Sequence, residues 1–131
     1  MIYLLDSDTC SYLIKGFDLN KRPAHASPDV TVAISSVTAM ELLFGMLKVG
    51  AATKYYSIVN NFLDNVEILP FDKSAATFAA QVRSQLHLVG NPIGAYDPMI
   101  AGHALSIGAV LVSNNTKHFK QVPGLMLENW F

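Results

Sequence analysis

The stretch that most constrains the fold is residues 91–115, which read NPIGAYDPMIAGHALSIGAVLVSNN. Asp97 precedes Pro98; proline suits the first turn of a helix, and the residue before a proline is pushed out of helical geometry. Apolar side chains then recur at helical spacing, and Gly108 follows where a helix end often needs a positive φ. Residues 109–112 are apolar and rich in valine, as in a strand buried on both faces. The stretch therefore predicts an N-cap at Asp97, a helix, a tight turn and a buried strand.

The rest of the chain repeats this alternation of short apolar runs and amphipathic segments. No repeat, linker or low-complexity tract interrupts it. The alternation predicts one α/β domain over residues 1–131, in which a central parallel sheet lies between two helical layers. Residues 17–29 are expected to form a polar connection, and residues 116–121 a short basic turn. The expected strands are residues 1–5, 31–35, 66–69, 109–112 and 124–127, and the expected helices are residues 9–16, 38–50, 51–65, 72–89 and 98–107.

Composition limits the classes of protein to which the chain can belong. Apolar residues make up 51% of the chain and charged residues only 15%, which excludes an intrinsically disordered protein. No apolar run reaches transmembrane length and no signal-peptide pattern is present, so we expect a cytoplasmic protein with no membrane partner. The lone Cys10 cannot form an internal disulfide and is expected to be a buried helix residue. A net charge of −1 means that any nucleic-acid site must be a local basic patch.

Polar side chains follow several of the expected strands at the points where these strands end. Asp6 follows the first strand, Glu41 lies early in the helix after the second, and Ser113 and Asn115 follow the fourth. Asp97 joins them because its helix runs back into the fourth strand, and the carboxyl ends of parallel strands meet at one sheet edge. Carboxylates gathered there would repel one another unless a cation lay among them, and Mg²⁺ or Mn²⁺ prefers such ligands. The pattern predicts a metal site that can activate water for attack on a phosphate.

Several of the acids also have a purely structural explanation. Asp6 could end the first strand or cap the helix that follows, and Asp8, like Ser7, is favoured as the cap of that helix. Asp97 could be a plain N-cap, a role compatible with metal binding because a helix N-terminus stabilises a carboxylate. Periodicity alone does not separate these roles.

Two further side chains of chemical interest lie inside expected helices. Glu41 has capping-box spacing from Thr38, so a structural role at the start of that helix is the simpler interpretation when Glu41 is taken by itself. His103 has small neighbours on an apolar helix, and for such a histidine we favour a hydrogen-bonded packing role over catalysis.

Three segments of the chain form motifs that follow one another in order. They are LLDSDTCSYLIKG at the start, ISSVTAMELLFG in the middle, and NPIGAYDPMIAGHALSIGAVLVSNNTKHF followed by VPGLMLENW near the end. These motifs resemble those of the PIN-domain ribonucleases, and specifically the VapC-type toxins of bacterial toxin–antitoxin pairs. The resemblance spans nearly the whole chain, and its last motif is long and specific. Residues 17–29 and 51–65 carry little of it.

The resemblance implies a three-layer PIN-like fold and a metal-dependent endoribonuclease that halts translation. The catalytic acids of the family fall on Asp6, Glu41 and Asp97, which would hold Mg²⁺ or Mn²⁺. A VapB-like antitoxin would inhibit the enzyme by threading a C-terminal segment across the acidic site. The resemblance also makes RNA the substrate, with the anticodon loop of initiator tRNA as a candidate.

This chain departs from the family pattern at two positions near the expected site. Many PIN domains have a fourth acid after the next strand, where this chain has Asn115, with Ser113 in place of a threonine. Asp8 stands where the family usually has asparagine, and it adds a carboxylate near the one that is missing. The resemblance therefore supports one metal site more strongly than two, with these three residues as candidates for a supporting role around the ion.

The sequence leaves two main functions open. The first is an active nuclease in which a metal-bound water attacks RNA. The second is a PIN-fold module that binds RNA or an antitoxin, with catalysis weakened by Asn115; an aspartyl-phosphate receiver domain is a third option, which the long final motif disfavours. The presence of all three matched acids favours the nuclease.

Candidate partner surfaces are less well defined by the sequence. A mean hydropathy of +0.31 with sparse charge is consistent with a surface that a partner covers. The resemblance implies that this partner is a second copy of the chain or an antitoxin in a larger assembly. Leu13, Met46, Leu47, Tyr55 and Tyr56 are candidates for that surface, although core packing explains most of them equally well. Four lysines are candidates for binding RNA phosphates, although most surface lysines are only solvated. These candidates are Lys15, Lys48, Lys117 and Lys120.

Overall fold

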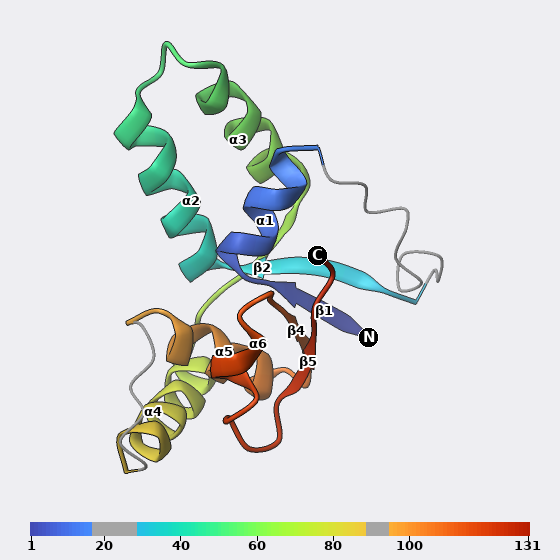
Figure 1. Ribbon diagram of the computed structural model, residues 1–131, viewed down its shortest axis with the longest axis vertical. Coiled ribbons are helices and arrows are strands. Elements are labelled where there is room, and N and C mark those ends of the chain that lie inside the picture. The colour runs from blue at the N-terminus through green and yellow to red at the C-terminus, as the bar shows by residue number, and fades with distance from the viewer. Residues whose placement is uncertain (17–28, 89–94) are drawn as a thin grey trace.

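A parallel sheet forms the centre of the computed structural model, which describes residues 1–16, 29–88 and 95–131 (Figure 1). Its strand order is β3-β2-β1-β4-β5, and every pairing in it is parallel. The strands are β1 (Ile2–Leu5), β2 (Thr31–Ser35), β3 (Glu67–Leu69), β4 (Val110–Val112) and β5 (Met126–Glu128). The helices are α1 (Ser7–Ile14), α2 (Ser36–Val49), α3 (Lys54–Asn65), α4 (Lys73–Leu88), α5 (Asp97–Ser106) and α6 (Thr116–Phe119).

Helices cover both faces of this sheet. Figure 1 shows α1, α2 and α3 on one side of the strands and α4 and α5 on the other, with the hairpin of α2 and α3 extending away from the sheet. The predicted three-layer α/β/α architecture with a central parallel sheet is thereby confirmed. The predicted polar connection, apart from Asp29, lies outside the described residues, as does the expected end of the long fourth helix near residue 89.

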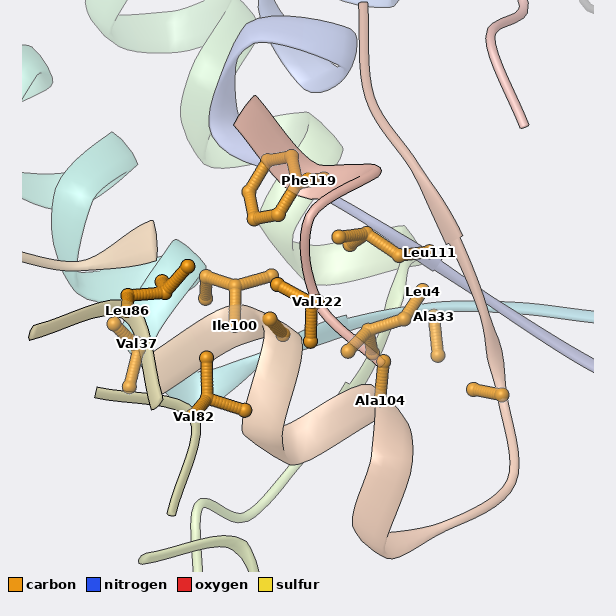
Figure 2. Packing of buried hydrophobic residues seen from close by; sticks show 12 residues of the cluster. Leu4, Ala33, Val37, Val82, Leu86, Ile100, Ala104, Leu111, Phe119 and Val122 are labelled. Atoms are coloured by element: carbon orange, nitrogen blue, oxygen red, sulfur yellow. The ribbon is translucent and has the colours of Figure 1, made fainter. Parts of the chain in front are cut away.

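Strand alternation divides the interior into two hydrophobic layers. Leu4 is paired with Ala33 and Leu111 on the neighbouring strands, and all three side chains face the α4 and α5 side because successive strand residues point to opposite faces. Figure 2 shows them packed with side chains from those helices and from the segment after α6. These helix and segment residues include Val82, Leu86, Ile100, Ala104, Phe119 and Val122.

The next residue along each central strand belongs to the second layer. Leu5 is paired with Ile34 and Val112, and these three pack against α1, α2 and α3. Cys10 lies in this layer as a free and fully buried thiol, as the sequence predicts, and burial raises its pKa far above the usual range. Trp130, which is 2% exposed, closes the same layer from the C-terminal end.

The closest helix contact in the described structure joins α4 to α5 at Gly102. A Cβ atom added to Gly102 would overlap the backbone nitrogen and Cα of Ala79, and would lie 2.8 Å from the carbonyl carbon of Phe78. The absence of a side chain at this position therefore sets the distance between the two helices. Because α5 carries Asp97, this contact also sets where one of the predicted site acids lies.

The helix starts differ from the sequence predictions in three places. Asp6, rather than Ser7 or Asp8, caps α1: its Oδ1 accepts a hydrogen bond of 2.8 Å from the Thr9 backbone N–H. The chain passes from β2 into α2 without a loop, and the cap of α2 is Ser35. The capping box predicted for Thr38 and Glu41 is therefore wrong, because both residues already lie inside the helix.

Asp97 is the third correction, since it is the first residue of α5 and not its N-cap. Tyr96 occupies the cap position with helical backbone angles and makes no side-chain cap hydrogen bond. Asp72 caps α4, because the Ala75 backbone N–H donates to its Oδ1 at 2.9 Å. Other differences are shifts of a few residues: α3 starts at Lys54 after the Thr53 cap, the predicted basic turn contains the helical turn α6, and β5 ends at Glu128.

Among the described helices, none is both long enough and apolar enough to cross a membrane.

Candidate active site

Asp6 lies at the carboxyl end of the central strand, where it is 8% exposed. The Thr9 backbone N–H and the Ser113 hydroxyl both hydrogen-bond its carboxylate. The Thr9 hydroxyl in turn donates to the carbonyl of Val112 at 3.1 Å, which ties the start of α1 to the end of β4. The position of the carboxylate is therefore fixed by two neighbouring strands and by the helix that it caps.

Glu41 reaches the same edge from the second turn of α2. It is partly exposed, and the Ser7 hydroxyl donates to its Oε2 at 3.4 Å. Because Ser7 directly follows Asp6, this contact turns the carboxylate of Glu41 toward the end of β1. Direct passage from β2 into α2 brings Glu41 to the sheet edge, since no loop separates the strand from the helix.

Asp97 approaches from the other helical layer, at the N-terminus of α5. The helix runs antiparallel to β4, so its first residue stands at the carboxyl edge of the sheet, where the backbone dipole favours a negative charge. Burial and the charge of Asp6 both raise the pKa of Asp97, with burial the larger effect. The structure therefore brings the three predicted acids Asp6, Glu41 and Asp97 to one place.

Burial and neighbouring negative charges raise the pKa values of all three carboxyl groups. Burial is the main cause that raises the pKa of Asp6, and it is opposed by the hydrogen bonds from Ser113 and Thr9. Burial also raises the pKa of Glu41, and the charges of Asp97 and Asp6 raise it further. Clustered carboxyl groups with raised pKa values are typical of sites that bind a cation or a proton.

These raised pKa values predict a specific dependence of stability on pH. The folded carboxyl groups bind protons more tightly than the unfolded ones, so folding takes up protons between the ordinary carboxyl pKa of about 4 and the raised values. We compare the wild-type protein with the triple variant Asp6→Asn, Glu41→Gln, Asp97→Asn, both without divalent cations. As pH rises from 4 to 7, the free energy of unfolding of the wild-type protein should fall relative to that of the variant. Calorimetry of both proteins across this range measures the difference, and a constant difference would contradict raised pKa values.

The residues predicted to support the acids lie at different depths. Ser113 is fully buried, and its hydroxyl also accepts a hydrogen bond of 2.9 Å from the Asn115 backbone N–H. The Asn115 amide lies 3.3 Å from Nδ1 of His118 and makes no cap hydrogen bond to α6. Asp8 is exposed, and its charge raises the pKa values of Asp6, Glu41 and Asp97. Asp8 is therefore near enough for its charge to act on the acids, and it is not the cap of α1.

The four candidate lysines do not form one basic patch beside the acids. Lys15 is the C-cap residue of α1, and Lys48 is in the last turn of α2, two turns beyond Glu41. Lys117 and Lys120 are exposed in and just after α6. Lys15 lines a pocket together with Asp8. Through Asp8, it is the candidate lysine that the structure links to the acid cluster.

A buried link between the helices that carry the acids is not evident from the sequence. His103 on α5 is 1% exposed, and its Nδ1 lies 2.8 Å from Oγ of Ser35. The same oxygen accepts the backbone N–H of Val37 at 3.1 Å and so caps α2. Burial lowers the pKa of His103, and Phe71 packs edge-on against its ring. The hydrogen-bonded packing role predicted for His103 agrees with this arrangement, but its partner lies 68 positions away.

The fold and this acid cluster agree with a known family. The PIN domain family model matches residues 3–125, and the chain therefore belongs to the PIN domain family.

The relatives place the chain more narrowly. It is 38% identical to the tRNA(fMet)-specific endonuclease VapC of Salmonella typhimurium, over 98% of this chain and 97% of the relative. The fold superposes on the structure of VapBC2 from Rickettsia felis bound to a DNA fragment from their promoter with a TM-score of 0.90, at 36% identity and full coverage of both chains. For DNA-bound VapBC from Salmonella typhimurium the TM-score is 0.85, at 37% identity, over 100% of this chain and 99% of that one. Within the PIN domain family, the chain is of the VapC type.

Proposed function

We propose that this chain is a divalent-metal-dependent endoribonuclease that acts as a toxin, with Asp6, Glu41 and Asp97 as its catalytic acids. The observation that carries the proposal is the convergence of these carboxyl groups from the end of β1, from α2 and from α5, where Asp6 raises the pKa values of both Glu41 and Asp97, and Asp97 raises that of Glu41. A cluster of this kind is suited to phosphodiester hydrolysis, because a cation held there can neutralise charge that develops on the phosphate. The similarity to VapC nucleases supports the same reaction.

The donor chemistry of the site fits Mg²⁺ or Mn²⁺. All three candidate side chains offer hard carboxylate oxygens, and their mutual repulsion would be relieved by a cation. Within the residues that the structure describes, no three His, Cys, Asp or Glu side chains stand close enough to ligate one ion directly. Mg²⁺ commonly uses only one or two carboxylates and keeps several waters, so two direct ligands and one acting through water would suffice. When bound, the ion would activate a water and polarise a phosphate oxygen.

Hydrogen bonds from neighbouring residues hold two of the acids in position. Ser113 and Thr9 hold the Asp6 carboxylate in place, and Ser7 orients Glu41. One turn before Glu41, the buried hydroxyl of Thr38 has no hydrogen-bond partner among the described residues. An unpartnered buried hydroxyl is costly, and a water within reach of it would satisfy it.

The substrate and partner follow from the relatives. We propose initiator tRNA as the first RNA to test, because the Salmonella relative is named as a tRNA(fMet)-specific endonuclease, and we place the activity in the cytoplasm. We also propose a VapB-like antitoxin as partner, since the structural neighbours are VapBC complexes. A homodimer of the toxin is proposed with it, and light scattering at micromolar concentration tests that assembly.

The outer face of α2 supports a partner that buries apolar surface. Met40, Leu43, Phe44 and Leu47 lie at i, i+3, i+4 and i+7 spacing, and each is at least 40% exposed. Such a stripe is long enough for an amphipathic helix to dock on. Met46, which the sequence made a candidate for this surface, is buried in the core instead.

Direct cleavage tests the proposed function. Purified protein is incubated with total RNA and with initiator tRNA, each with Mg²⁺, with Mn²⁺ and with chelator, and the new RNA ends are sequenced. We expect discrete cuts that need a divalent ion and that disappear when the antitoxin is added. Cleavage that persists unchanged in chelator would contradict the metal mechanism, and the absence of any cut would favour the binding module.

A further inference from the structure

A second polar site lies beside the acid cluster. It is a pocket of about 330 Å³ at the carboxyl edge of the sheet, formed by one face of α1 and by the loop after β4. The Asn114 amide donates to the hydroxyl of Tyr12 at 3.2 Å and so joins the two walls. The four α1 positions have i, i+3, i+4 and i+7 spacing, which places them on one helix face. The pocket is lined by Asp8, Ser11, Tyr12, Lys15 and Asn114.

This pocket is contiguous with the acids on two sides. Asp8 lines the pocket, and its charge also acts on all three acids. Asn114 directly follows Ser113, whose hydroxyl bonds to Asp6. An RNA strand whose scissile phosphate lay on the acids would therefore carry a neighbouring nucleotide to this pocket.

The chemistry of the lining fits a nucleobase better than a phosphate. The Asp8 carboxylate only accepts hydrogen bonds and the Lys15 ammonium only donates them, while the Asn114 amide and the Tyr12 hydroxyl can do both. A phosphate would be repelled by Asp8, which is exposed at the pocket. The edge of an unpaired base carries both donors and acceptors, and proteins read single-stranded RNA through such edges. The volume lies at the lower end of the range for small-ligand sites, about 300–1,000 Å³.

We propose that this pocket binds the base of a nucleotide next to the scissile phosphate, with Asp8 and Lys15 reading its hydrogen-bonding edge. This inference rests on the proposed RNA cleavage and extends it to a determinant of sequence preference. The pocket then gives Asp8, which does not cap α1, a role beside the acids. It also gives Lys15 a role that the other three candidate lysines do not share.

The test compares base preference in matched variants. Wild-type protein, Asp8→Asn and Lys15→Met are given a single-stranded RNA library with randomised positions, and the cut ends are sequenced. We expect wild-type protein to prefer certain bases at one position beside the cut, and each variant to reduce that preference about fivefold or more at the same position. Asp64→Asn and Lys54→Met on α3 are the charge-matched controls, and both should reproduce the wild-type profile.

Three results would overturn the base-reading proposal. An unchanged preference in both variants would show that the pocket does not read the base. A uniform loss of cleavage across all sequences with Lys15→Met would show a phosphate contact instead. Weaker Mn²⁺ binding by Asp8→Asn in calorimetry without RNA would make Asp8 a metal ligand.

A measurement of RNA binding tests the pocket independently of cleavage. In the Asp97→Asn background, anisotropy of labelled short RNAs that differ at one base reports preference without cutting. We expect a preference that Lys15→Met removes, and equal binding of all the RNAs would contradict the pocket even if wild-type protein cuts RNA. Base-dependent binding by a protein that never cuts would instead remove the proposed nuclease function and leave the pocket in place.

Discussion

Asp6→Asn and Asp97→Asn are each expected to lower the rate of RNA cleavage by more than about a hundredfold while leaving the protein folded. The expected loss is large because even partners that only orient a metal ligand are worth about 10- to 100-fold. Asparagine keeps the shape of each side chain but removes the charge that would hold the cation. Cleavage of a fluorescent RNA in Mn²⁺ measures the effect.

The cap at Asp6 provides an internal control for this prediction. Asparagine caps a helix about as well as aspartate, so Asp6→Asn should keep the hydrogen bond from the Thr9 N–H and unfold at or above the wild-type temperature. Asp6→Ala should lose both the charge and the cap, with a loss of about 1 kcal/mol in unfolding free energy. Rapid cleavage by well-folded Asp6→Asn or Asp97→Asn protein would exclude that acid from the mechanism.

Gly102→Ala is expected to destabilise the protein by about 3 kcal/mol or more, which corresponds to roughly 10 °C in melting temperature. The added methyl group would overlap the backbone of Ala79, and backbone, unlike a flexible side chain, cannot turn aside. Separation of α4 from α5 would also move Asp97, so we expect cleavage to fall with stability. Thermal unfolding followed by circular dichroism measures the change.

Gly45→Ala is the matched control, because Gly45 also lies inside a helix. A Cβ atom there would meet only the Tyr55 hydroxyl, at 3.9 Å. Alanine is the better helix former by about 1 kcal/mol, so this substitution should stabilise the protein slightly. Equal effects of the two substitutions would contradict a close α4–α5 contact at Gly102.

The sequence was sufficient for the sheet and for the position of the three acids at one edge of it, because both follow from the order of the expected strands and helices. Apolar runs such as residues 109–112 mark the strands, and parallel connectivity then places Asp6, Glu41 and Asp97 at one edge. The helix caps were less predictable, because Asp6, Ser7 and Asp8 are all good capping residues within one turn. Only the hydrogen bond from Thr9 to Asp6 distinguishes them.

Contacts between distant segments could not be predicted in the same way. The polar face of α1 is visible as helical spacing from Asp8 to Lys15, yet its partner Asn114 joins Tyr12 from 102 residues away. The contact of His103 with Ser35 likewise needs the packed layers, because no local periodicity relates the two positions. Close approach of α5 to Ala79 is also invisible in the sequence, where Gly102 could equally mark a weak point in the helix.

The packing of Trp130 gives the molecule an optical reporter of one of its layers. It is the only tryptophan of the chain, and its ring lies 5.7 Å from that of Tyr3 on β1. Its surroundings also include side chains from the α1, α2 and α3 side of the sheet. Intrinsic fluorescence excited at the indole therefore follows the half of the protein that holds α1 and α2, while α4 and α5 stay spectroscopically silent.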